Sequence, residues 1–89
     1  MEFSSHECVR FRTWLKENTS FSSRVVSDTV SRLRRLGEFV DPTAAGSEAE
    51  LGYLLQQQAE FQRLQPSVKS QLKRAGMLYR QFIDTQPNM

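Results

Sequence analysis

The chain has 89 residues, of which 38% are hydrophobic and 25% charged, so it can bury one modest core but not a core plus a deep cavity. This composition excludes an obligately disordered chain, and no apolar run approaches the ~18 residues of a membrane span. The lone cysteine, Cys8, excludes an internal disulfide framework and a multi-cysteine zinc site. We expect one domain over residues 1–89, with its core at about 5–84 and a frayed tail at 85–89, either complete or cut from a longer protein.

The first predicted helix covers residues 5–17. Ser4 or Ser5 can cap it, because a serine oxygen accepts hydrogen bonds from the free N–H groups of a first turn. Its apolar residues recur at helical spacing and form one face: Cys8, Phe11, Trp14 and Leu15.

The second predicted helix covers residues 22–40 and has the clearest pattern. Ser22 is the expected N-cap, and Phe21 before it can pack on Val26 as a hydrophobic staple. The stripe expected to be buried is Val26, Val30, Leu33, Leu36 and Val40. We expect Asp41-Pro42 to end the helix, because a residue before proline avoids the α region.

The third predicted helix covers residues 47–64, after a short loop at 43–46. Ser47 and Glu50 have the spacing of a capping box, in which each side chain reaches the other's backbone N–H. The expected inward face is Leu51, Leu54, Leu55 and Phe61.

The fourth predicted helix follows Gln65-Pro66, is capped by Ser67 and extends to about residue 84. Its expected buried residues follow a 4, 3, 4, 3 rhythm: Val68, Leu72, Ala75, Tyr79 and Phe82. Four helices joined by short loops, with no convincing strand, predict an all-α fold, a four-helix bundle.

Charge is distributed unevenly along the chain. The formal net charge is +2, but residues 24–40 carry +2, residues 41–60 carry −4 and residues 61–89 carry +4. Such polarity indicates a surface that meets a polyanion on one side. Solubility and pairing within the domain would explain the same layout, so both interpretations stay open.

The fourth predicted helix carries the strongest functional signal, a row of cations. Residues four and seven apart share a helix face, and cations at that pitch can reach successive phosphates. The row and its flanking residues are Lys69, Ser70, Lys73, Arg74 and Arg80. Gly76 lies on the same face. Glycine in a helix interior is less stable than alanine by about 1 kcal/mol, so its presence here indicates close approach of a neighbouring helix or of a phosphate chain. A solvated helix side would show the same row.

The second predicted helix offers a companion patch of Arg24, Arg32 and Arg35, provided that the two helices lie side by side. Asp28 within this patch can pair with Arg24 or Arg32 one turn away. A solvated face of mixed charge explains these residues equally well. We expect no membrane partner, because the apolar face of the basic helix is needed for the core.

Residues for catalysis or metal binding are few. His6 and Cys8 are two ligands where a tetrahedral zinc site needs about four, and the carboxylates are scattered singly. We expect no enzyme activity from these residues and no cofactor or metal.

Four stretches together resemble the N-terminal core-binding domain of tyrosine recombinases, the phage-integrase family. They are Phe11-Arg12-Thr13-Trp14-Leu15, Ser20-Phe21-Ser22, VSRLRRLGEF at 30–39 and KSQLKRAGMLYRQFI at 69–83. The resemblance spans about residues 8–84. It implies a SAM-like orthogonal four-helix bundle that clamps one face of double-stranded DNA with its second and fourth helices.

The resemblance also implies a role in DNA recombination and integration, as in mobile elements, for a cytoplasmic protein of bacterial or phage origin. The catalytic domain of that family has no counterpart in these residues, so a downstream domain would carry any activity. The candidate DNA-binding residues are Ser22, Arg24, Arg32, Arg35, Lys69, Ser70, Lys73, Arg74 and Arg80. The alternative is a protein-interaction bundle, whose basic face meets an acidic partner or the opposite face of another copy.

Overall fold

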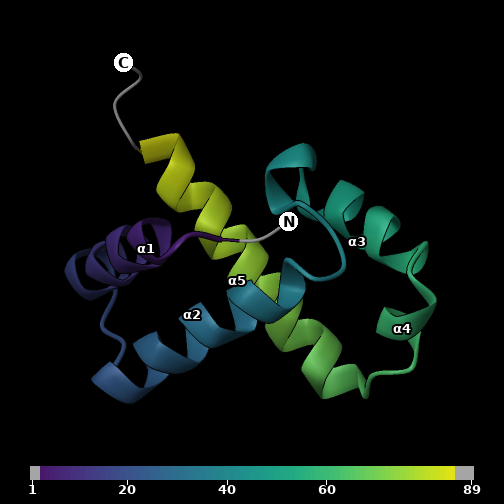
Figure 1. Cartoon of the computed structure of the whole chain (residues 1–89), viewed down its shortest axis with the longest axis horizontal. Coiled ribbons are helices and arrows are strands. Elements are labelled where there is room, and N and C mark those ends of the chain that lie inside the picture. The colour runs from purple at the N-terminus through teal and green to yellow at the C-terminus, as the bar shows by residue number, and fades with distance from the viewer. Residues whose placement is uncertain (1–2, 86–89) are drawn as a thin grey trace.

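The computed structural model describes residues 3–85, and these form five α-helices and one short 3-10 helix, with no strand among them (Figure 1). The elements are α1 (Ser5–Asn18), α2 (Ser23–Leu36), η1 (Pro42–Ala44), α3 (Glu48–Gln56), α4 (Ala59–Gln62) and α5 (Pro66–Thr85). The predicted all-α class is therefore confirmed. Of the tail expected at 85–89, Thr85 is instead the last residue of α5, and 86–89 lie outside the described residues.

The long helix α5 is the centre of the molecule. Figure 1 shows α1 and α2 on one side of it and α3 and α4 on the other, with α2 crossing α5. The most extensive helix pairing in the described chain is that of α2 with α5. The two hydrophobic clusters described below both include residues of α5.

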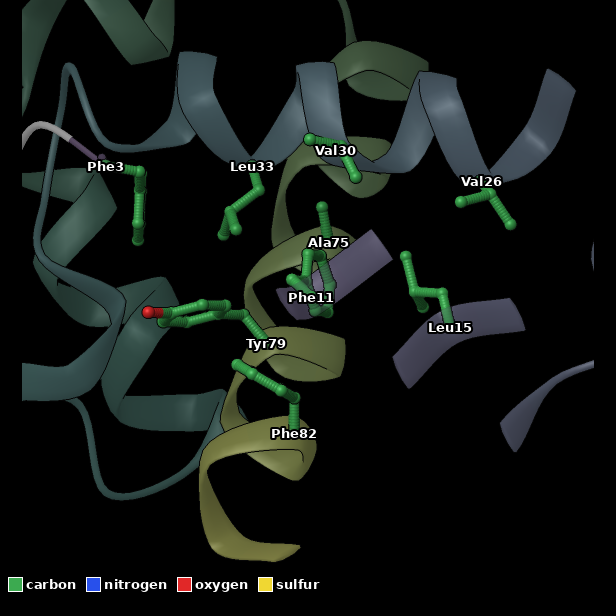
Figure 2. Close-up of a cluster of buried hydrophobic side chains, with 9 residues drawn as sticks. All are labelled: Phe3, Phe11, Leu15, Val26, Val30, Leu33, Ala75, Tyr79 and Phe82. Atoms are coloured by element: carbon green, nitrogen blue, oxygen red, sulfur yellow. The ribbon is translucent and has the colours of Figure 1, made fainter. Parts of the chain in front are cut away.

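The first core joins α1, α2 and the second half of α5. Figure 2 shows its side chains: Phe3, Phe11, Leu15, Val26, Val30, Leu33, Ala75, Tyr79 and Phe82. Aromatic rings meet edge to face inside it, with the centroids of Phe11 and Tyr79 at 5.4 Å, a geometry that adds stabilisation beyond area burial. Phe3 packs edge-on against Tyr79 at 5.0 Å, so the core begins before the predicted residue 5.

The second core lies between α3, α4, the end of α2 and the first half of α5. Its buried residues are Leu36, Ala45, Leu51, Leu55, Phe61 and Leu72. Gly76 makes this packing possible, because a Cβ at this position would lie 2.6 Å from Cδ2 of Leu36 and 3.1 Å from Cδ2 of Leu51. The close approach expected at Gly76 is therefore to neighbouring helices of the domain.

Serine caps begin three of the helices. Oγ of Ser4, Ser22 and Ser47 accepts a hydrogen bond from the N–H of the third residue after it, at 3.1, 3.2 and 3.1 Å. The capping box at Ser47 is half correct, because the Glu50 carboxylate accepts from the N–H of Gly46 rather than from that of Ser47. Ser67 is not a cap: α5 already begins at Pro66, and proline suits a first helical position because it needs no N–H partner there.

Two predicted helix boundaries are wrong. α2 ends at Leu36 rather than near Val40, because Gly37 caps it and the chain turns, with the N–H of Phe39 donating to the Leu36 carbonyl. This turn brings the Phe39 ring to 5.6 Å from that of Phe61. The predicted helix at 47–64 is divided at Gln57 and Gln58, where the backbone of Gln58 is extended.

Candidate nucleic-acid interface

The surface between α2 and α5 is hollowed into a cleft of about 280 Å³ that contains two arginines and no carboxylate. Its lining residues are Phe21, Val25, Thr29, Arg32, Gln71, Arg74, Ala75 and Leu78. Arg32 comes from α2 and Arg74 from α5, so the structure brings these two predicted site residues together. The Arg74 guanidinium lies 5.8 Å from the Phe21 ring centroid, a cation–π contact that favours an ordered position for the charge.

The outer face of α5 continues this basic surface. Ser70, Lys73 and Arg74 line a shallow hollow together with Met77 and with Glu48 of α3. Arg74 belongs to both hollows, so the positive surface extends from Arg32 across the cleft to Lys73. Glu48 brings one negative charge to that surface, next to Lys73 and Arg74.

The expectation that the whole row Lys69, Lys73 and Arg80 shares this surface is wrong, because Lys73 borders the surface whereas Arg80 is engaged elsewhere. Lys73 lines a second hollow with Gly52 and Tyr53 of α3, and the Arg80 guanidinium donates to the Thr43 carbonyl of η1 at 3.3 Å. Lys69 precedes Lys73 by four residues and shares its helix face. The row faces α3 and η1 because its fourth member, Gly76, is buried against Leu36 and Leu51.

On α2, the predicted contacts differ in exposure. Arg24 and Arg35 are exposed, whereas Arg32 is half-buried in the cleft. The Oγ atom of Ser22 accepts the capping hydrogen bond from the N–H of Val25, which leaves its hydroxyl hydrogen free to donate to a ligand. The ion pair expected between Asp28 and either Arg24 or Arg32 does not form within residues 3–85.

The cations of this interface are not neutralised by carboxylates of the described chain. Within residues 3–85 the observed ion pair is Arg63 with Glu60, at 3.5 Å on the exposed surface of α4. The unpaired cations of the two helices are Arg24, Arg32, Arg34, Arg35, Lys69, Lys73 and Arg74. An uncompensated set of this kind attracts anions to the surface.

Six residues of the cleft are not among the predicted site residues: Phe21, Val25, Thr29, Gln71, Ala75 and Leu78. Val25 is an apolar residue outside the buried stripe of α2, and this was the available signal in the sequence. Its side chain is 39% exposed.

No cluster of three or more potential metal ligands occurs among residues 3–85, and Cys8 is a half-buried free thiol. Burial, followed by the nearby Glu7 carboxylate, raises the pKa of the Tyr79 hydroxyl, so this phenol stays neutral at physiological pH. In the same part of the chain, no helix is both long and apolar enough to cross a bilayer.

Comparison with protein-family models, with curated proteins and with solved structures found no match to this chain.

Proposed function

We propose that this domain binds double-stranded DNA through phosphate contacts made by α2 and α5. The observation that supports the proposal is the continuous set of unpaired cations from Arg32 across the cleft to Arg74 and Lys73. The sequence resemblance to integrase core-binding domains agrees with the choice of these two helices.

The proposed contact surface is smaller than the one predicted from the sequence. Its centre is Arg32, Ser70, Lys73 and Arg74, with Arg24 and Arg35 extending it along α2. Ser22 keeps a hydroxyl proton for a phosphate oxygen at the start of α2. Lys69 contributes from the α3 side. Arg80 is left out, because its guanidinium is engaged by the Thr43 carbonyl.

Binding of this kind depends little on base sequence and strongly on salt. Each phosphate that a cation neutralises releases condensed counterion, and the observed affinity then falls as the salt concentration rises. Lysine and arginine contacts to phosphate fix position, whereas base contacts supply specificity. We therefore expect similar affinity for duplexes of unrelated sequence.

The test is a titration of a fluorescent duplex of ~25 bp, followed by anisotropy at salt concentrations between ~50 and ~200 mM. Arg74→Gln should weaken binding and reduce the slope of log affinity against log salt by about one. Arg63→Gln is the matched control, because Arg63 lies on α4 and is paired with Glu60. No binding at ~50 mM salt, or equal losses in the two variants, would contradict the proposal.

A further inference from the structure

The α2–α5 cleft has an apolar floor that phosphate binding does not require. Phe21, Val25, Ala75 and Leu78 form this floor, of which Ala75 is almost fully buried. The Arg74 guanidinium lies over the Phe21 ring, and Arg32 lines the same cleft. A hydrated phosphate gains nothing from an apolar wall, whereas an apolar side chain gains roughly 25 cal/mol for each Å² that it removes from water. The floor therefore suits a ligand with both an apolar side chain and negative charge.

Helix α3, which lies on the other side of α5 from α2, presents such a group. Tyr53 on α3 is 63% exposed, and it is one of three large hydrophobic residues exposed in the described chain, with Val9 and Val25. Glu50 precedes Tyr53 by three residues and shares its helix face, and Glu48 is exposed at the start of α3. Tyr53 also belongs to the segment 41–60, which carries a net charge of −4.

We propose that the domain associates head to tail with a second copy of itself, so that Tyr53 of one copy occupies the α2–α5 cleft of the next. The tyrosine ring covers the floor at Val25 and Phe21, and the acidic end of α3 faces Arg32 and Arg74. Charge complementarity selects this occupant, because the cleft contains two arginines and no carboxylate, whereas Glu48 and Glu50 of α3 outnumber the one cation that borders the Tyr53 hollow, Lys73.

The two surfaces are different parts of the molecule, so the contact is heterologous. Figure 1 shows α2 and α3 on opposite sides of α5. A heterologous contact leaves one free cleft and one free tyrosine at the ends of every assembly, and it continues into rings or open chains. It also uses Arg32 and Arg74, so double-stranded DNA and self-association compete if both occur.

Two single variants remove one side of the contact each. Tyr53→Ser removes the inserted ring from an exposed position. Val25→Glu places a carboxylate in the cleft, and it should not unfold α2, because a glutamate three residues after the cap Ser22 completes a capping box. We expect the unaltered protein to show mass that rises with concentration up to ~1 mM in sedimentation equilibrium, and each variant to stay monomeric.

Mixing the two variants gives the decisive measurement. Tyr53→Ser keeps the cleft and Val25→Glu keeps the tyrosine, so the mixture should form a one-to-one dimer and nothing larger. A monomeric mixture, or unaltered protein that is monomeric throughout the concentration range, would overturn the proposal, as would variants that associate like the unaltered protein. A dimer that never grows, with each variant still self-associating, would indicate a symmetric contact elsewhere and also reject it.

A charge-matched pair of variants tests the role of the arginines. Arg32→Gln should weaken association about tenfold, because it removes a charged hydrogen-bond donor from the cleft. Arg35→Gln removes the same charge one turn away, outside the cleft, and should leave association within about twofold of the unaltered protein. Equal effects of the two variants would show that association depends on net charge alone, and this would contradict the proposed position of α3. At protein concentrations well below those at which the domain associates, Tyr53→Ser should leave DNA affinity unchanged, so this proposal and the proposed function fail separately.

Discussion

Gly76 and Gly52 are both helical glycines, but their surroundings differ. A Cβ on Gly76 would meet Leu36 at 2.6 Å and Leu51 at 3.1 Å, whereas a Cβ on Gly52 would meet only Nζ of Lys73, at 3.9 Å. Gly76 therefore supports the close packing of three helices, while Gly52 borders an open hollow.

We predict opposite effects of alanine at these two positions. Gly76→Ala should destabilise the domain by about 1–2 kcal/mol, because overpacking against two leucines exceeds the gain in helix propensity. Gly52→Ala should stabilise it by up to about 1 kcal/mol. Urea denaturation followed by circular dichroism measures both changes, and equal effects would show that the Leu36 and Leu51 contacts do not limit the site.

Tyr79 is a buried phenol whose pKa is raised, first by burial and then by the Glu7 carboxylate. Its folded pKa lies above the unfolded value of about 10. Above that pH the unfolded chain loses the phenolic proton before the folded protein does, so stability falls as pH rises through the folded pKa.

The expected result is a loss of stability above about pH 10 that Tyr79→Phe reduces. Tyr53→Phe is the control, because Tyr53 is exposed. Denaturation midpoints measured on either side of about pH 10 give the comparison. A pH dependence that is unchanged in Tyr79→Phe would assign the effect to other groups.

Among the elements, α2 depends on its serine cap. The Ser22 hydroxyl oxygen satisfies the N–H of Val25, whereas Ser23 is the first residue of the helix and is exposed. Ser22→Ala should lower the free energy of unfolding by about 1 kcal/mol, and Ser23→Ala should leave it within about 0.5 kcal/mol. Thermal melting of the two variants checks this prediction. Equal melting temperatures would show that the Ser22 cap does not stabilise α2.

The helical spacing of apolar residues and the capping residues predicted most of the elements. The buried positions of α2 from Val26 to Leu36 and those of α5 from Leu72 to Phe82 were read correctly, since regular spacing dictates which face turns inward. The end of α2 was misplaced by about four residues, because Val40 continues the stripe although it lies beyond the turn at Gly37. The break at Gln57–Gln58 has no local signal and follows from the packing of Phe61 on Phe39.

The candidate site was only partly predictable. The positions of Lys73 and Arg74 around the axis of α5 follow from the sequence, and these neighbours border one common hollow and one further hollow each. Which helix lies on each side is a tertiary property. The arrangement of helices around α5 places Arg74 in a cleft with Arg32 and places Lys73 next to α3 as well.

At the scale of the whole molecule, α5 links the two cores. Phe82 and Tyr79 belong to the first core and Leu72 to the second, all on one helix. The cores should therefore unfold together, even though α1 and α3 lie on opposite sides of α5.

This coupling predicts that a substitution in the second core also shifts the unfolding transition of the first core. Leu51→Ala should cost about 2–5 kcal/mol. It should shift the fluorescence transition of Trp14, which packs against the first core, as far as the circular dichroism transition. A Trp14 transition that stays in place while the helical signal changes would show two independent units.

The position of α5 in the chain also has a consequence for synthesis. Because α5 is made after the other four helices, the apolar faces of α1 and α2 leave the ribosome before Ala75, Tyr79 and Phe82 exist to cover them. The nascent chain therefore passes through an interval in which the first core is incomplete, and chaperone contact is expected in that interval.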